Sequence, residues 1–342
     1  MPEALTSVTP WRQELAQSLR DPDALWQYLQ LPPEHLPAAR ALAKEFPLVA
    51  PMPFVRRITP QTMNDPLLMQ LCPVAAEAQA VPGFSHDPVG ERLAQVQPGM
   101  LRKYHGRALL ITTSSCAIHC RYCFRRHFPY AQRARGPGWW RPAIAHIAAD
   151  DSIDEVILSG GDPLMLSDEQ LAQVVSEIAA IQHVQRLRIH SRLPIMIPQR
   201  LDLSCRQWLN QDSLQMVLVL HANHAQEIDE QVCQSLQPLR QEGVHLLNQA
   251  VLLRGINDSA QAQRLLGERL LSAGVLPYYL HALDPVAGAA HFHIGDQEAI
   301  AIMDELHRLT AGYLVPRLVR EVPGEAGKRW IWPSGNDHGD CT

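Results

Sequence analysis

The chain has 342 residues, of which 46% are hydrophobic and 19% are charged, and this composition excludes an intrinsically disordered protein. Its 30 basic and 35 acidic side chains give a formal net charge of -5, so charge alone would not hold a nucleic-acid backbone. No stretch approaches the roughly 18 uninterrupted apolar residues of a membrane helix, and the first residues lack the pattern of a secretory signal. We therefore expect a cytoplasmic protein that binds neither nucleic acid nor a membrane.

Residues 1–100 are expected to form an N-terminal helical collar followed by a wrapping arm. Apolar residues recur at helical spacing early in this segment, for example at Leu15, Leu19 and Leu25. Prolines then recur between Pro47 and Pro98 and prevent any long helix. The second half of the segment must therefore be irregular and lie on another part of the molecule.

From residue 107 onward, short apolar runs alternate with amphipathic helices, which is the pattern of a parallel sheet whose strands are apolar on both faces. Ser167 and Gln170 form a capping box before one helix, and Gly243 and Gly274 mark the ends of two others. The pattern predicts an α/β fold, a partial (βα)6 TIM-like barrel over residues 101–285, with its chemistry at the carboxyl ends of the strands. The six predicted strands cover residues 107–113, 155–159, 186–190, 215–221, 245–253 and 275–281.

Three cysteines stand in a C-x3-C-x2-C arrangement on the loop after the first predicted strand: Cys116, Cys120 and Cys123. A cubane iron–sulfur cluster usually takes four cysteines, so three would leave one iron open to a non-protein ligand. The alternative is a zinc site completed by His119 or His127, although structural zinc sites pair two short Cys/His couples and no second couple is present. The remaining thiols are scattered, at Cys72, Cys205, Cys233 and Cys341.

The cysteine triplet, with Tyr122 before its last cysteine, resembles the signature of radical S-adenosylmethionine enzymes. The resemblance implies that the open iron binds S-adenosylmethionine and that electron transfer from the reduced cluster releases a 5'-deoxyadenosyl radical, which abstracts hydrogen from an unactivated carbon. Gly160, Gly161 and Asp162 resemble the glycine-rich strand end that contacts the same cofactor, although such residues also form plain turns. Three further residues match family positions lining S-adenosylmethionine: Arg192, His221 and Gln249. Each of the three could instead be a hydrogen-bonded polar residue of the core.

Lysine occurs only three times, so an enzyme that uses a lysine amine has few candidates. Lys44 falls in the helical collar among residues typical of a solvated face. Lys328 ends a glycine-containing loop, residues 323–328, within the C-terminal segment 286–342, and flexible backbone there could present the amine to a central cavity. A solvated loop lysine is the alternative, whereas a phosphate-binding Walker loop does not fit the glycine spacing.

A proline–glycine loop that ends in lysine, far downstream of a cysteine triplet, is similar to the lysine 2,3-aminomutase family. In that family the lysine holds pyridoxal phosphate. The likeness runs from Lys103 to Lys328, and within the family the sequence most resembles the shorter bacterial members associated with modification of translation elongation factor P. The matching stretches are residues 120–126, 158–164, 191–192, 248–258, 277–279 and 291–292.

The same resemblance implies which residues bind the charged groups of the cofactor and the substrate. Lys103 and Arg107 match the positions that bind the phosphate of pyridoxal phosphate, although they could also be ordinary surface charges. Arg125 matches the arginine that binds the substrate carboxylate. Asp284 and Glu321 match the two acidic residues that receive the terminal ammonium of lysine.

Two positions depart from the family pattern near that substrate end. The family usually has aspartate where this chain has Glu321, and His293 stands where an arginine is typical. A glutamate is one methylene longer, which could shift the bound ammonium or weaken its hold.

The resemblance implies a radical S-adenosylmethionine, pyridoxal-phosphate-dependent isomerase that converts L-lysine to β-lysine by 1,2-amino migration. It also implies an electron donor for the cluster and a functional link to elongation factor P and its lysyl-transferring ligase, while a homodimer is one candidate for the oligomeric state. Two alternatives stay open at this point: an aminomutase acting on another amino acid, and a non-catalytic iron–sulfur or zinc module that docks onto elongation factor P.

Overall fold

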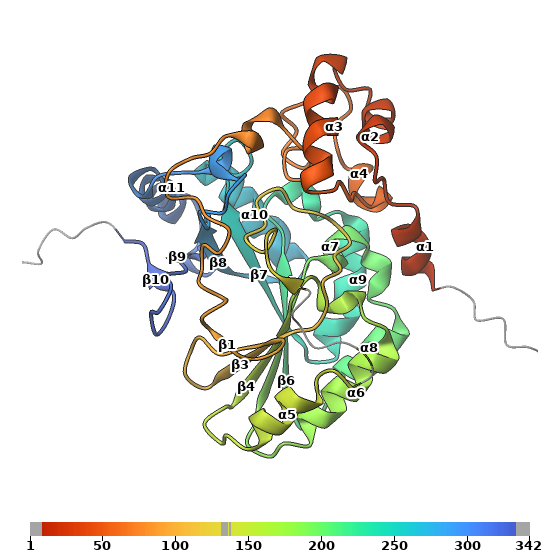
Figure 1. Ribbon diagram of the computed structural model, residues 1–342, viewed down its shortest axis with the longest axis vertical. Helices are drawn as coiled ribbons and strands as arrows, with labels where there is room; N and C mark the ends of the chain where they lie inside the picture. The colour runs from red at the N-terminus through yellow and green to blue at the C-terminus, as the bar shows by residue number, and fades with distance from the viewer. Residues whose placement is uncertain (1–8, 131–135, 137, 333–342) are drawn as a thin grey trace, which may run out of the picture.

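The computed structural model of the protein describes residues 9–130, 136 and 138–332. Its centre is a run of seven parallel strands, β3 to β9, in one ten-stranded sheet that follows chain order (Figure 1). The strands are β3 Arg107–Ile111, β4 Glu155–Ser159, β5 Arg186–Ser191, β6 Gln215–His221, β7 His245–Leu252, β8 Leu276–Ala282 and β9 Arg317–Arg320. The antiparallel strands β1 Gln95–Gln97 and β2 Met100–Leu101 extend one edge, and β10 Arg329–Trp330 extends the other. The predicted α/β partial barrel is confirmed.

All six predicted strands are present, and β9 is an additional parallel strand that the sequence reading missed. This strand is only four residues long, and the apolar run around it is divided because a 3-10 helix occupies Gly312–Leu314. It pairs with β8 through Tyr279 and Arg317, Leu280 and Leu318, and His281 and Val319. Because Glu321 directly follows β9, the missed strand is the element that positions this predicted site residue.

In the described residues, each successive pair of parallel strands is connected by a helix of seven or more residues on the outside of the curved sheet (Figure 1). These helices are α5 Arg141–Ala148, α6 Asp168–Ala179, α8 Leu203–Leu209, α9 Glu230–Gln241, α10 Ala260–Ser272 and α11 Asp296–Leu309. The capping box at the start of α6 is confirmed, because the Gln170 backbone N–H donates to Ser167 Oγ and the Gln170 side chain accepts from the Ser167 N–H. Gly243 and Gly274 follow α9 and α10 with φ of 82° and 74°, as expected of residues that end helices.

The N-terminal segment contributes four short helices, which gather at one end of the molecule (Figure 1). They are α1 Pro10–Ala16, α2 Pro22–Leu29, α3 Leu36–Glu45 and α4 Met52–Val55. A proline occupies the first turn of each, where its missing N–H costs no helical hydrogen bond. Trp11, Phe54 and Leu67 belong to the same buried hydrophobic cluster as Leu158 of β4 and Leu218 of β6. The collar therefore packs onto the barrel through one continuous core, while the domain boundaries named above stay predictions.

The arm that follows α4 crosses the loop after β8 on its way to β1. Ser85 forms a bridge with Val286: the Ser85 N–H donates to Pro285 O at 2.8 Å, and the Ala287 N–H donates to Ser85 O at 2.9 Å. This path brings Val89 and Glu91 to the interior of the sheet, where both line a cavity.

The expectation that the strands are apolar on both faces is wrong for β5. Leu187 and Ile189 are fully buried in the core, but the alternate residues Arg188 and His190 line the interior cavity. Successive side chains of a strand point to opposite faces, so one face of β5 packs against helices and the other faces a polar interior. Within the described part of the chain, no helix has both the length and the apolar character needed to cross a membrane.

Candidate active site

One cavity of about 490 Å³ lies inside the curved sheet, a volume typical of a small-molecule site. It reaches from Arg107, at the start of β3, to the cysteine loop beyond the carboxyl ends of the strands. All of the predicted site residues line it: Lys103, Arg107, Cys116, Cys120, Cys123, Arg125, Gly160, Gly161, Asp162, Arg192, His221, Gln249, Asp284, Glu321 and Lys328. The fold thus brings together residues that are up to 225 positions apart, from Lys103 to Lys328, while their individual roles stay predictions.

The three cysteines line one end of this cavity as free thiols. Burial raises the pKa of Cys116 well above its usual range and that of Cys123 to about 11, and the neighbouring cysteines add to both shifts. When neighbouring thiols would repel one another as thiolates, a metal centre that replaces their protons stabilises the thiolate forms most. Among the described residues, no group of three or more His, Cys, Asp or Glu side chains has the geometry of a single metal-ion site. A cubane cluster does not require such convergence because its thiolates bind different irons.

The two histidines proposed as a fourth zinc ligand are engaged elsewhere. His119 Nδ1 lies 2.8 Å from Pro47 O, and its ring stacks on Phe46 at 4.9 Å. His127 Nε2 lies 3.3 Å from Ala287 O, and its ring stacks on His86 at 4.1 Å. These contacts give no support to the zinc alternative. Of the other thiols, Cys72 and Cys205 are buried and Cys233 lies in α9, whereas Cys341 lies outside the described residues.

The N-terminal segment holds the cysteine loop through a buried carboxylate, Glu77. Arg121 donates to both oxygens of Glu77, with Nε to Oε1 at 2.8 Å and Nη2 to Oε2 at 2.6 Å. Arg126 Nη2 donates to the same Oε2 atom at 3.0 Å. Both guanidinium groups also lie over the ring of Phe46, at 4.8 and 4.7 Å from its centroid. Arg121 is fully buried, and no local pattern in the sequence distinguishes Glu77, its partner.

Gly160 and Gly161 allow the end of β4 to pack against the backbone that leads into the cysteine loop. The Gly161 N–H donates to Thr113 O at 2.7 Å, and the Asp162 N–H donates to Ser115 O at 2.8 Å. A Cβ atom on Gly161 would lie 2.4 Å from Ser115 O, which backbone atoms cannot tolerate without moving. These glycines therefore fix the cysteine loop whether or not their backbone also contacts a cofactor.

Replacing Gly161 with alanine should displace the cysteine loop and reduce its capacity to retain iron, at a stability cost of roughly 1–3 kcal/mol for the overpacked site. The measurement is iron content after anaerobic reconstitution, together with the thermal unfolding midpoint. Gly295→Ala is the matched control, because a Cβ atom there meets nothing within 4 Å. Equal iron content in the two variants would contradict the expectation.

The carboxylate of Asp162 joins the ends of β4 and β5 by accepting four hydrogen bonds. It accepts hydrogen bonds from Ser191 Oγ at 2.7 Å and from the backbone N–H groups of Leu164, Arg192 and Leu193 at 3.0, 2.8 and 2.9 Å. Burial raises the pKa of this carboxyl, and the hydrogen bonds oppose the shift. Its observed contacts are thus within the protein, and contact with S-adenosylmethionine stays a prediction.

The amine of Lys328 lies at the other end of the cavity, close to Glu321. Lys328 Nζ is 2.5 Å from Glu321 Oε2, and it lies 5.8 Å from the ring centroid of Tyr279. Lys103 Nζ is 3.1 Å from Glu321 Oε1. Burial alone would raise the pKa of Glu321, but the two lysines outweigh it and hold this pKa at about 2. The carboxylate therefore stays ionised between the two lysine ammonium groups, while its contact with a substrate ammonium stays a prediction.

The guanidinium group of Arg125 is largely occupied by the carboxylate of Glu91, a residue that the sequence did not predict. Arg125 Nε donates to Glu91 Oε2 at 2.7 Å and Nη2 donates to Oε1 at 2.6 Å, while Nη1 donates to Ser159 Oγ and Gly160 O. Glu91 comes from the irregular arm, where no local pattern distinguishes it. A substrate carboxylate would share Arg125 with this residue.

Asp284 is a buried carboxyl near the lysine end, on the loop after β8. Its Oδ1 atom has no hydrogen-bond partner among the residues that the structure describes. Burial raises its pKa from 3.8 to about 7, although the positive charge of Lys328 partly opposes the shift. A cation that enters the cavity beside such a buried carboxyl group would stabilise its ionised form and lower its pKa.

The raised pKa of Asp284 predicts a pH-dependent stability that Asp284→Asn should remove. The folded protein holds a proton that the unfolded chain releases, so the free energy of unfolding falls as pH rises from about 4 to about 7. Between pH 5 and pH 8, Asp284→Asn should gain up to roughly 3 kcal/mol relative to the parent protein, at 1.36 kcal/mol per pKa unit. Denaturant unfolding at both pH values, without substrate, measures this gain, and a pH-independent difference would contradict it.

Three further basic residues that the sequence analysis did not predict line the cavity: Arg188, His190 and His281. Arg188 Nη2 lies 3.1 Å from Glu155 Oε2, while its Nε atom has no partner within the described chain. Burial lowers the pKa of both histidines, so their imidazoles are neutral at pH 7. A signal was available in the sequence, because basic residues recur at every second position from Arg186 to Arg192 and one face of the strand is therefore polar.

Comparison with known proteins agrees with this geometry. A family model described as a 4Fe-4S single cluster domain matches residues 105–189, which include the three cysteines and the glycine pair. A protein of Escherichia coli (strain K12) named L-lysine 2,3-aminomutase is 48% identical over 319 residues, which cover 93% of each chain. Relatives of the same name from Haemophilus influenzae and Clostridium subterminale are 45% and 32% identical, covering 93% and 95% of this chain and 94% and 78% of theirs. The chain belongs to the L-lysine 2,3-aminomutase family.

Members of the L-lysine 2,3-aminomutase family are isomerases, and membership together with the 4Fe-4S domain implies an iron–sulfur cluster, S-adenosylmethionine and pyridoxal phosphate. The residues present fit these groups. Three half-buried thiols offer a cluster three ligands at one end of the cavity, and Lys328 offers a primary amine at the other. Asp284 lies in the same cavity, and its Oδ1 atom meets no partner among the described residues.

Proposed function

We propose that the protein converts L-lysine to β-lysine by 1,2-amino migration. The observation that carries the proposal is that the three thiols, the amine of Lys328 and the carboxyl groups of Asp284 and Glu321 all line a single cavity. When bound, the cluster and S-adenosylmethionine supply a hydrogen-abstracting radical, and pyridoxal phosphate supplies a carbonyl group that carries the migrating nitrogen. The protein supplies positioning and keeps water and other quenchers away.

Lys328 would hold pyridoxal phosphate, because it ends the loop that resembles the family's cofactor-binding loop and its amine lies in the cavity, 2.5 Å from Glu321 Oε2. Lys103 and Arg107 would bind the phosphate at the same end of the cavity. The unused Nε atom of Arg188 makes this residue a third candidate for the phosphate.

Substrate L-lysine would be held by its two charged ends. Arg125 would bind the carboxylate, and Glu91 would fix the orientation of its fork. Once Lys328 holds the cofactor, Glu321 Oε2 is free to receive the terminal ammonium together with Asp284. A glutamate substrate would bring a third carboxylate to this end of the cavity, where charge repulsion disfavours it.

An amino-acid assay tests the proposal. Anaerobically reconstituted protein is incubated with S-adenosylmethionine, pyridoxal phosphate and dithionite, and L-lysine, L-ornithine and L-glutamate are compared by mass spectrometry. L-lysine should be converted at least about tenfold faster than the others, since a lost or misplaced charge-assisted contact costs ~1.5–3 kcal/mol. Turnover of glutamate and none of lysine would overturn the substrate assignment and favour an aminomutase for another amino acid.

We also propose that the β-lysine serves the modification of translation elongation factor P through a lysyl-transferring ligase. This part is supported by the resemblance to the shorter bacterial family members rather than by contacts within the chain. A cytoplasmic location, an electron donor for the cluster and a homodimer belong to the same proposal. Loss of β-lysyl elongation factor P in cells that lack the protein, with restoration by added β-lysine, is the expected result.

A further inference from the structure

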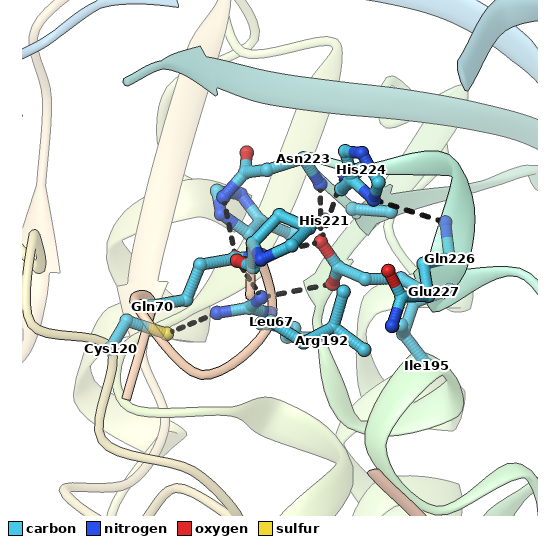
Figure 2. Close-up of polar contacts among 12 residues, drawn as sticks. Leu67, Gln70, Cys120, Arg192, Ile195, His221, Asn223, His224, Gln226 and Glu227 are labelled. Carbon is cyan, nitrogen blue, oxygen red and sulfur yellow. Dashed lines mark hydrogen bonds and ion pairs between the residues drawn. The ribbon is translucent and has the colours of Figure 1, made fainter. Parts of the chain in front are cut away.

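A buried polar network contacts one of the three cysteines from the side of β5 and β6 (Figure 2). Arg192 follows β5, and its Nη1 atom donates to Cys120 Sγ at 2.7 Å. Its Nη2 atom donates to Glu227 Oε2 at 2.9 Å and also to Gln70 Oε1. One guanidinium group therefore joins a cluster cysteine to a carboxylate and to the N-terminal arm.

Glu227 is fully buried and holds this guanidinium in a fixed orientation. Besides Arg192, it accepts from Gln70 Nε2 at 3.0 Å and from the backbone N–H groups of Asn223 and His224 at 2.8 and 3.0 Å. Figure 2 shows these residues converging on the carboxylate from the loop after β6 and from the arm. A buried, hydrogen-bonded pair of this kind has little freedom to reorient.

The hydrogen bond from Arg192 to Cys120 Sγ would affect the reduction potential of a cluster bound there. The reduction potential of an iron–sulfur cluster depends on its net charge and on hydrogen bonds to its sulfurs. Reduction adds negative charge, so a cationic N–H donor on a ligand sulfur stabilises the reduced state more than the oxidised state. Glu227 supplies the opposite charge behind Arg192 and limits this effect.

We propose that the Arg192–Glu227 pair sets the reduction potential of the cluster through the hydrogen bond to Cys120 Sγ. The inference deepens the proposed function, because it requires that the three cysteines bind a cluster. It requires neither L-lysine as the substrate nor any contact between Arg192 and S-adenosylmethionine. The two charges act with opposite signs, so variants of each partner move the potential in opposite directions.

The experiment is an anaerobic redox titration of the reconstituted cluster, followed by electron paramagnetic resonance, without S-adenosylmethionine or amino acid. Glu227→Gln keeps the shape of the network but removes its negative charge, so the midpoint potential should shift to a more positive value. The double variant Arg192→Met/Glu227→Gln removes both charges and the N–H···S contact, so its midpoint should shift to a more negative value. Arg192→Lys keeps the positive charge but loses the two-pronged guanidinium geometry. Its midpoint potential should fall between those of the double variant and the parent protein.

The ion pair Arg200–Asp168, in which Arg200 is fully buried and the Asp168 side chain is 18% exposed, supplies the control. Arg200 Nη2 lies 2.8 Å from Asp168 Oδ1, and neither side chain lines the cavity in the described part of the chain. Arg200→Met/Asp168→Asn should leave the midpoint potential unchanged even if it lowers stability.

Two results would overturn the proposal. Unchanged midpoints in Glu227→Gln and in the double variant would show that the contact carries no electronic effect. Loss of iron from all three variants, with the control retaining it, would show that the network only holds the cysteine loop in place. Failure of L-lysine turnover alone would affect the substrate assignment and not this inference, because the titration contains no substrate.

Discussion

Lys328→Ala should reduce turnover of L-lysine on the order of a thousandfold or more, the scale seen when a residue that acts covalently is removed. The amine of Lys328 lies 2.5 Å from Glu321 in a cavity that also contains the cysteine triplet, and the other two lysines do not share this position. Lys103 contacts the opposite oxygen of Glu321, and Lys44 is exposed on α3. Removing the amine should therefore remove the attachment of pyridoxal phosphate without displacing the cysteines.

Three measurements separate this effect from misfolding. Lys328→Ala should lose the near-ultraviolet and visible absorbance of covalently held pyridoxal phosphate, keep the iron content of the parent protein, and show no product by mass spectrometry. Lys44→Ala is the control and should behave as the parent on all three. Retained absorbance and turnover in Lys328→Ala would show that another amine holds the cofactor, whereas loss of iron would show a structural role.

Glu77→Ala should destabilise the protein by about 3–5 kcal/mol, because it leaves two buried guanidinium groups without their shared counter-charge. The side chains of Arg121 and Arg126 are 0% and 5% exposed, and Glu77 is 1% exposed. Since both arginines flank Cys123, iron retention after reconstitution should fall as well. Denaturant unfolding and iron analysis measure the two effects.

Glu298→Ala is the comparison for this variant. Glu298 pairs with Arg254 at 2.7 Å, but both side chains are 47% exposed, and exposed ion pairs contribute about 0–1 kcal/mol. Its unfolding midpoint should thus shift little. If Glu77→Ala shifted the midpoint no more than Glu298→Ala does, the buried carboxylate would not be what holds the cysteine loop to the collar.

The parts of the fold that could be predicted are those whose signal is local. The six strands from β3 to β8 follow from apolar runs, and the capping box of α6 follows from Ser167 and Gln170. The strand β9 could not be found in this way, since its four residues follow a 3-10 helix that interrupts the run. The alternating basic residues of β5 do indicate its polar interior face, a local signal that outweighs the apolar content of the run.

The residues of the site divide in the same way, into those with a local sequence signal and those whose partners only the fold determines. The cysteine triplet and Lys328 stand out because thiols and lysines are rare in this chain and because their spacing is informative. Glu77, Glu91 and Glu227 do not stand out, although each pairs with a buried arginine. Their partners lie 44, 34 and 35 positions away, and only the fold determines which of the 35 acidic side chains meets which arginine.

The strand β10 has a consequence for local stability that follows from its size. It contributes two residues, pairs with β9 at the edge of the sheet, and begins at the residue after Lys328. So short a ladder releases at small free-energy cost, far below that of unfolding the barrel. The pairing that follows Lys328 should therefore open more readily than the longer ladders between β3 and β8, which border the cysteine loop.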